Sequence, residues 1–231
     1  EETIEKIKSF NDLIKSIENA NKKHRECMKY YINMMIRKNL DNIEWKLLGE
    51  LSDVKGGKRL PKGYSFSKEP TEYKYLRIGD FEDNHINYSK IKSINEKTFN
   101  ILIRYKIEKN DILISIGGTI GIVNFINSDI GNYILTENCV RLINSKTNAK
   151  YLYYYIKIIL NNRMKKLNGG SSIPRLSLLS IRKLKRPVPL DPVQEEIINY
   201  LDNINNIIDV NNQIIETYKK NIKEILRQSY E

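Results

Sequence analysis

A heptad repeat over residues 192–227 constrains the fold of this chain more than any other feature of the sequence. Two positions of each heptad are apolar or aromatic apart from one Asn, and they hold Leu201, Ile208, Ile215 and Ile222, and Ile197, Ile204, Asn211, Tyr218 and Ile225. Residues spaced in this way form the narrow seam of a coiled-coil helix. Because one helix cannot bury such a seam alone, this helix requires a partner along its length.

Residues 3–38 form a second helical pattern, without Gly or Pro, that supplies the expected partner. Its seam positions hold Ile7, Ile14, Asn21, Met28 and Met35, and Phe10, Ile17, His24 and Tyr31. One helix enters the intervening domain and the other leaves it, so we expect an antiparallel pair. If Met35 faces Ile197, Asn21 lies opposite Asn211, and a buried amide pair of this kind fixes helix register. Coincidence is the alternative, because Asn is abundant in this chain.

The residues between the two helices have a different composition. From Trp45 to Pro189, short segments rich in Ile, Tyr and Val alternate with Gly, Asn and Pro. This pattern is typical of an α+β domain. We therefore predict a coiled-coil helix over residues 1–40, a mixed α/β domain over residues 41–190 and a second coiled-coil helix over residues 191–231. The predicted fold class is α+β, with the two long helices forming an antiparallel coiled coil.

The charge of the chain favours a polyanionic partner. The net charge is +11 and the pI is about 9.4, which indicates nucleic acid before a membrane. A basic protein from an AT-rich genome, with no such partner, is the alternative. The two cysteines cannot form a disulfide framework, so we expect a reducing cytoplasm. The sequence shows neither an apolar run long enough for a membrane span nor a signal peptide.

The first candidate binding loop is residues 53–63 (DVKGGKRLPKG), which combine adjacent glycines with cationic side chains. The cations are Lys55, Lys58, Arg59 and Lys62. Paired glycines permit an unusual backbone, and Lys and Arg suit contacts to phosphates or base edges. The spacing is not that of a Walker loop. We expect the four cations to contact a nucleic acid.

Two further candidate segments follow in the middle domain. Residues 73–80 predict a strand that runs into a turn, where Arg77 can contact guanine and Asp80 can accept a hydrogen bond from cytosine N4. A local pair between these two side chains is the alternative. Residues 112–126 predict two strands joined by a glycine-containing reversal. The structural hairpin is favoured over a phosphate-binding loop here, with Thr119 facing ligand.

Residues 168–175 (NGGSSIPR) form a polar loop that no hydrophobic core requires, and Ser171, Ser172 and Arg175 are its candidate DNA contacts. Before this loop, residues 136–143 predict a strand and residues 148–167 predict a helix. After it, residues 182–189 return the chain to the C-terminal helix.

Signatures of catalysis are absent from the sequence. We find no H-E-x-x-H, C-x-x-C, G-x-S-x-G, dinucleotide fingerprint or methyltransferase D-P-P-Y tetrad. The two histidines, His24 and His85, leave few general bases. His24 and Cys27 are three residues apart, but two ligands make a weak metal site. We therefore expect no catalytic and no metal-binding residues in this chain.

Four segments resemble a known family when they are taken together. They are residues 45–57 (WKLLGELSDVKGG), 110–121 (NDILISIGGTIG), 169–177 (GGSSIPRLS) and 187–202 (PVPLDPVQEEIINYLD). In this order and spacing they resemble the DNA specificity subunit of type I restriction–modification systems, over nearly the whole chain. Each segment alone has low specificity, and the four together are fairly specific.

The resemblance implies a non-catalytic target recognition domain that binds double-stranded DNA. A full subunit of that family has two recognition domains and reads a bipartite site, whereas this sequence has one. The second would come from the rest of a longer subunit or from a second copy in a homodimer. The implied partners are a methyltransferase subunit and a restriction subunit. S-adenosylmethionine, Mg²⁺ and ATP would belong to those partners, and this chain would hold no cofactor.

Two other interpretations stay open at this point. The chain can be the C-terminal specificity domain of a fused restriction–methylation enzyme whose catalytic domains have been removed, which its start at Glu1 permits. A structural coiled-coil interaction protein is the third, but it would not need the residue 168–175 loop or a basic surface. Under the favoured interpretation, the loops at residues 55–62, 77–85, 119 and 169–175 form one DNA-facing surface.

Overall fold

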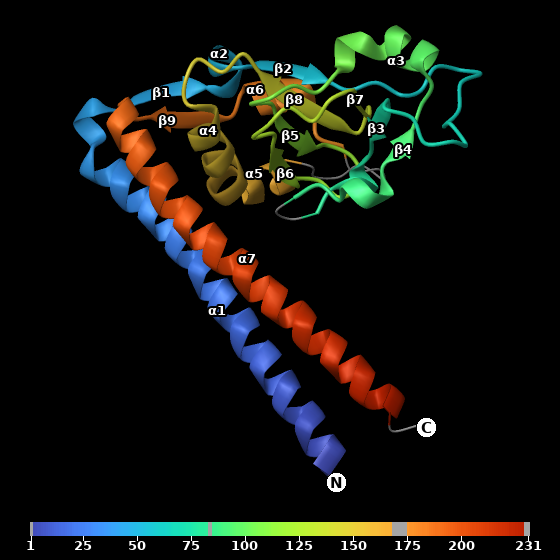
Figure 1. Ribbon diagram of the computed structural model, residues 1–231. Coiled ribbons are helices and arrows are strands. Elements are labelled where there is room, and N and C mark those ends of the chain that lie inside the picture. The colour runs from blue at the N-terminus through green and yellow to red at the C-terminus, as the bar shows by residue number, and fades with distance from the viewer. Residues whose placement is uncertain (1, 83–84, 168–174, 229–231) are drawn as a thin grey trace. The chain divides into compact units, whose positions relative to one another are not determined.

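The computed structural model of the protein describes residues 2–82, 85–167 and 175–228 (Figure 1). The chain divides into two compact units, which are described separately here. Residues 1–38 and 195–231 form a helical unit, and Asn39–Gln194 forms the second unit, called the recognition unit below. In the part of the chain that the structure describes, no helix combines the length and apolarity that a membrane crossing requires.

The helical unit consists of α1 (Glu2–Lys38) and α7 (Asp191–Gln228), which lie side by side and antiparallel, as the heptads predict (Figure 1). Seam residues of both helices are buried, including Ile14, Met28, Met35, Ile197, Leu201, Ile208 and Ile215. The apolar face widens toward the end of α1, where Ile32 and Ile36 are also buried. The α+β fold class with two long helices is therefore confirmed.

Amide and aromatic side chains fix the register of the two helices. Asn211 Nδ2 donates to Asn21 Oδ1 over 2.7 Å, and Asn21 Nδ2 donates to Asn212 Oδ1 over 3.1 Å. The rings of Tyr31 and Tyr200 stack with centroids 3.8 Å apart. The structure thus contains the Asn21–Asn211 pair that the heptads predict. It adds Asn212, which the heptads do not place on the seam.

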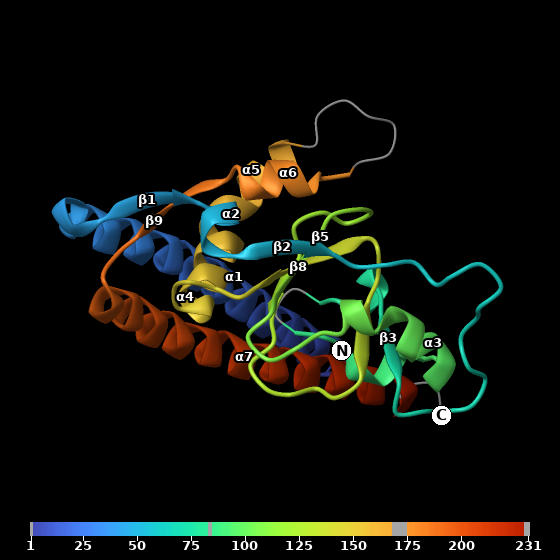
Figure 2. The ribbon, with the colours of Figure 1, turned by 90° about the horizontal axis from the view of Figure 1, so that it is seen from above.

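A four-stranded antiparallel sheet forms the centre of the recognition unit. Its strand order is β2 (Asp53–Gly56), β8 (Cys139–Ile143), β5 (Ile112–Ser115) and β6 (Val123–Phe125). Figure 2 shows β2, β8 and β5 next to one another. All four residues of β5 are buried, as expected for a central strand covered on both faces. The predicted hairpin is present, with Gly118 and Gly121 at positive φ.

A second sheet has three strands in the order β4 (Lys92–Ser93), β3 (Lys74–Leu76) and β7 (Tyr133–Leu135), with β3 and β7 parallel. Helix α3 (Glu96–Leu102) contributes Phe99 and Leu102 to the core of this sheet. Short 3₁₀ turns at Ile78–Asp80, Tyr88–Lys90 and Ile103–Tyr105 complete this half of the unit, and another, Leu40–Asn42, directly follows α1. The segment predicted as one strand from residue 136 to 143 is a loop followed by β8.

The remaining elements differ from the sequence prediction in two places. Residues 148–167 form α4 (Ala149–Tyr155) and α5 (Asn161–Lys166), with a π-helical turn at Ile156–Leu160 between them. The stretch before the last helix, expected to be a connection, contains strand β9 (Lys185–Val188), which pairs with β1 (Glu44–Leu47). Short helices α2 (Leu48–Leu51) and α6 (Leu178–Arg182) flank this ribbon. Propensity did not reveal β9, because its partner is far away in the sequence.

Candidate nucleic-acid interface

The loop Thr136–Asn138 joins β7 of one sheet to β8 of the other, and three of the predicted binding residues, Arg59, Arg77 and Arg175, lie near it. The backbone after β2 runs beside this loop: Gly57 N–H donates to the Cys139 carbonyl over 2.9 Å, and Lys58 N–H donates to the Leu135 carbonyl over 3.0 Å. A Cβ atom on Gly57 would lie 2.0 Å from the Thr136 carbonyl oxygen. Glycine is therefore required for this close approach.

Glu137 is held by hydrogen bonds at both carboxylate oxygens. Oε1 accepts from Arg59 Nε over 2.8 Å, and Oε2 accepts from Thr136 Oγ1 over 2.9 Å. Burial raises the pKa of Glu137, but hydrogen bonds from Arg59, from its own backbone N–H and from Thr136 outweigh burial and lower the pKa below its ordinary value. The carboxylate is therefore ionised at neutral pH.

Tyr75 contacts both Lys58 and Glu137. Its hydroxyl donates to the Lys58 carbonyl over 2.6 Å and lies 3.4 Å from Glu137 Oε2. Burial raises the pKa of Tyr75 to about 12, so the phenol stays protonated and remains a donor. The ring of Phe66 meets that of Tyr75 edge to face with centroids 5.8 Å apart. The Glu137 carboxylate thus lies next to a tyrosine whose position is fixed by a hydrogen bond and a ring contact.

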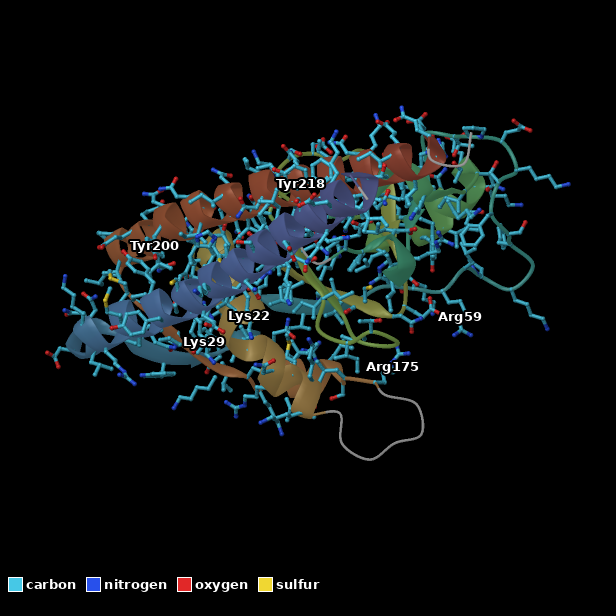
Figure 3. The ribbon with its side chains drawn as sticks, turned by 90° about the horizontal axis from the view of Figure 1, so that it is seen from below. Lys22, Lys29, Arg59, Arg175, Tyr200 and Tyr218 are labelled. Atoms are coloured by element: carbon cyan, nitrogen blue, oxygen red, sulfur yellow. The ribbon has the colours of Figure 1, made fainter. Side chains whose placement is uncertain are left out.

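Arg175 reaches the same loop from the other side. Its Nη2 donates to the Glu137 carbonyl over 2.9 Å, and Nη1 lies 3.4 Å from Asn138 Oδ1. Its backbone forms an isolated β-bridge with Gly117, at the start of the β5–β6 turn. In Figure 3, Arg59 and Arg175 lie on the same side of the recognition unit. Two predicted DNA-binding arginines therefore flank Glu137.

Arg77 and Asp80 form a local pair, so the expectation that Asp80 is presented for base contact is wrong. The Asp80 side chain is 1% exposed and accepts from Arg77 Nη2 over 2.8 Å, from Arg77 Nε over 3.2 Å and from the Arg77 backbone N–H over 2.8 Å. Arg77 Nη2 also lies 3.3 Å from the Lys90 carbonyl oxygen, as a second acceptor. The Arg77 guanidinium stays about one-third exposed and lies 5.8 Å from the Phe66 ring centre.

A cavity of about 440 Å³ opens between these segments. It is lined by Arg59, Leu60, Phe66, Tyr75, Arg77, Ile78, Gly79, Thr136, Glu137 and Asn138. Two guanidinium groups, one carboxylate and one amide face it over an aromatic floor. Such a mixture of donors, acceptors and flat apolar surface suits the edges of nucleic-acid bases.

The other predicted contacts have the following positions. Lys55 lies on β2 and is exposed, as are Lys58 and Lys62 in the loop that follows. Thr119 is exposed in the β5–β6 turn, where its carbonyl accepts from Ser115 Oγ over 2.6 Å. A Cβ on the neighbouring Gly118 would lie 3.7 Å from Ile78 Cδ1, so this turn approaches the Arg77 segment. Ser171 and Ser172 fall outside the described residues.

The residues that sequence analysis missed are Thr136, Glu137 and Asn138. Three polar residues directly before the apolar strand Cys139–Ile143 are a loop signal, yet the segment was predicted as part of the strand. No sequence signal indicated that other loops converge on it. Within the described ranges, no cluster of three His, Cys, Asp or Glu side chains is suited to hold a metal ion.

Comparisons with known proteins agree with this architecture. The model of the family described as type I restriction modification DNA specificity domain matches residues 40–220. The solved S subunit of the M. genitalium type I restriction–modification system aligns with a TM-score of 0.60 at 15% identity, over 97% of this chain and 56% of that one. The HsdS subunit from Thermoanaerobacter tengcongensis aligns with a TM-score of 0.56 at 15% identity, over 98% of this chain and 56% of that one.

A third solved chain, from a study of complex assembly and conformational transition of the type I R-M system, aligns with a TM-score of 0.58 at 19% identity. The alignment covers 100% of this chain and 59% of that one. The present chain therefore spans little more than half the length of these subunits. No curated protein sequence matches the chain.

Proposed function

The chain belongs to the family of type I restriction modification DNA specificity domains, and we propose that it binds a specific sequence of duplex DNA and directs its partner subunits to that site. The convergence of Arg59, Arg77 and Arg175 around the Thr136–Asn138 loop carries this proposal. These residues come from three segments of the sequence: Arg59 and Arg77 line the cavity, and Arg175 donates to the Glu137 carbonyl in the adjoining loop.

In this mechanism the exposed cations provide affinity and the cavity provides sequence discrimination. Lys55, Lys58 and Lys62 would neutralise phosphates, which gives affinity that falls steeply with salt. Arg77 and Arg175 would approach base edges in the major groove, where each base pair has its own pattern of donors and acceptors. Thr119, Ser171 and Ser172 remain proposed contacts from the neighbouring turns. Asp80 is not among them because it is buried.

The helical unit would dock the methyltransferase subunit and set the distance to a second recognition domain. Ile207, Val210 and Ile214 support docking, because they are apolar, lie on one side of α7 and are 37–54% exposed. The second domain would come from the remainder of a longer subunit or from a second copy of this chain. Ile207→Ser with Ile214→Ser should then abolish co-purification of the methyltransferase subunit.

In the proposed function, this chain recognises DNA and catalyses no reaction. S-adenosylmethionine, Mg²⁺ and ATP would be bound by the partner subunits, which would also flip and modify the target base. Purified chain should therefore neither methylate nor cut DNA when these cofactors are supplied. Turnover that is absent from a mock purification would contradict this part of the proposal.

The decisive experiment compares the methylation patterns of cells with and without this gene, in the presence of the methyltransferase subunit. We expect one sequence motif to be methylated only when the gene is present. A double variant, Arg77→Ala with Arg175→Ala, should lose or relax that motif, whereas Lys97→Ala, a lysine on α3 outside the cavity, should not. An unchanged pattern, together with no duplex binding by the purified chain, would refute the function.

A further inference from the structure

The carboxylate of Glu137 lies among cations on the surface proposed to face DNA. Its side chain is 21% exposed, next to Arg59 and Arg175. A carboxylate repels phosphates and so weakens general affinity for DNA. The groups of duplex DNA that a carboxylate can bind are the hydrogen-bond donors on base edges. The position of Glu137 is therefore suited to contact bases rather than the backbone.

The two carboxylate oxygens of Glu137 have different environments. Oε2 is bound by Thr136 Oγ1 and lies near the buried Tyr75 hydroxyl, so it is anchored to the domain. Oε1 is bound by Arg59, whose side chain is 79% exposed. The anchored oxygen orients the carboxylate, while the other oxygen is bound by an exposed side chain that can leave.

The structure permits Arg59 to leave without moving the loop that carries it. The backbone at Gly57 and Lys58 is fixed by hydrogen bonds to Cys139 and Leu135, whereas the Arg59 side chain extends into solvent. An exposed Arg–carboxylate pair contributes little stability, because solvent screens it. A nearby DNA phosphate offers the guanidinium an equivalent charged acceptor.

We propose, on the basis of the proposed DNA-binding function, that Glu137 is a specificity-determining residue of this interface. Arg59 moves from Glu137 Oε1 to a phosphate when DNA binds. The released Oε1 then accepts a hydrogen bond from an exocyclic amino group, cytosine N4 or adenine N6, in the major groove. The Arg59–Glu137 pair of the free protein thus holds the acceptor in position until a base replaces the guanidinium.

This arrangement predicts which bases are rejected. Guanine O6 and thymine O4 are acceptors in the positions where cytosine and adenine carry amino groups. An ionised carboxylate cannot donate to them and is repelled by their partial negative charge. The lowered pKa of Glu137 keeps the group in its acceptor-only form at neutral pH. One position on the contacted strand of the target site should therefore require cytosine or adenine and reject guanine and thymine.

The test uses the chain in complex with its methyltransferase subunit and a duplex library randomised at each position of the methylated motif. Glu137→Gln converts an acceptor into a group that also donates. At one motif position it should reduce the preference for cytosine or adenine by about tenfold, the usual cost of one mismatched base pair. Glu72→Gln is the matched control, because Glu72 is exposed and accepts from Asn132 Nδ2 over 2.8 Å before β3 begins.

Arg59→Ala tests whether the Arg59–Glu137 pair serves base recognition or only stabilises the loop. It should keep the base preference, weaken all sequences alike and lower the salt-dependence slope by about one phosphate contact. Equal weakening of all sequences by Glu137→Gln, with preferences unchanged, would overturn the inference and assign the pair to loop stability. If the wild-type complex itself selects no motif, the proposed function fails instead. Thermal unfolding of each variant identifies misfolding separately.

Discussion

Two arginine–carboxylate pairs of the recognition unit have the same chemistry and opposite environments. Arg59 and Glu137 have side chains that are 79% and 21% exposed, whereas Arg141 and Asp111 are 10% and 6% exposed. Arg141 Nη1 lies 3.2 Å from Asp111 Oδ2 and also donates to the Lys106 carbonyl, while Nη2 donates to the Arg104 carbonyl over 3.0 Å. The buried pair is thus saturated by protein groups.

The difference shows how burial decides between a structural and a binding role. Desolvation makes the loss of one partner costly inside the domain, because the remaining charge cannot be hydrated. At the surface, water or a phosphate replaces the partner at little cost. The buried pair therefore stabilises the four-stranded sheet, and the exposed pair is available for exchange with DNA.

Arg141→Met should have the largest effect on stability. It leaves Asp111 buried without its cation, so the free energy of unfolding should fall by about 3–5 kcal/mol. Chemical denaturation at neutral pH would measure the loss. Arg59→Met is the control at the exposed pair and should leave the unfolding midpoint unchanged. Equal losses in the two variants would remove the distinction between the pairs.

The stability of the Arg141→Met variant should also depend on pH, through the buried Asp111. Burial raises the pKa of Asp111 despite hydrogen bonds from the Glu108 backbone and Arg141, and removing Arg141 should raise this pKa further. A carboxyl whose pKa is higher in the folded state favours folding at low pH, and this contribution is lost as pH rises through the folded pKa. The variant's deficit should therefore be smaller near pH 4 than at pH 7, measured by unfolding at both values.

Arg186 tests what happens to a buried arginine that has no carboxylate. Its side chain is fully buried, and among the described residues no hydrogen-bond partner exists for its three guanidinium nitrogens. Burial lowers the pKa of Arg186 to about 10, partly offset by Tyr151 and Tyr155. Arg186→Met should raise the free energy of unfolding by about 1–3 kcal/mol. The gain should shrink as pH rises above 10, because the wild-type cation is then neutralised in the folded state. A loss of stability in chemical denaturation at neutral pH would contradict this prediction.

In the helical unit, the contacts of Asn21 provide a neutral and partly buried pair for comparison. Asn21 is 3% exposed and bonds to Asn211 and Asn212. Asn21→Leu should lower the free energy of unfolding by about 1–2 kcal/mol, because Asn211 loses its partner. Adding Asn211→Leu should recover stability while loosening the register. Cysteine cross-linking between the helices would detect the slip; a double variant that is less stable than the single one would argue against the pairing.

Lys58→Ala should give the smallest effect, and only on DNA binding. Lys58 is exposed and its backbone, rather than its side chain, carries the contacts to Leu135 and Tyr75. Removing one phosphate contact should weaken all duplex sequences alike and reduce the salt-dependence slope by about one. Binding titrations at several salt concentrations would measure this. A change of base preference would show that Lys58 reads a base edge instead.

The sequence by itself determined the helical unit and the family. Heptad periodicity is local, so it predicted α1, α7, their antiparallel direction and the Asn21–Asn211 pair, and four ordered segments indicated the family that the comparison with known proteins confirms. Glycine pairs and cationic side chains also indicated the loops that carry Arg59 and Arg175. These features depend on residues close together in the chain, where spacing translates directly into geometry.

Only the tertiary structure decided the composition of the candidate site. Glu137 became its centre because β7 and β8 belong to different sheets and their connecting loop meets Arg59 and Arg175. Asp80 was removed from it because the 3₁₀ turn folds the carboxylate back onto Arg77. Strand β9 likewise exists through pairing with β1, from the opposite end of the domain. Contacts between residues distant in the chain leave no periodic pattern in the sequence. Burial then decides whether a charged side chain is available to bind DNA or is paired within the protein.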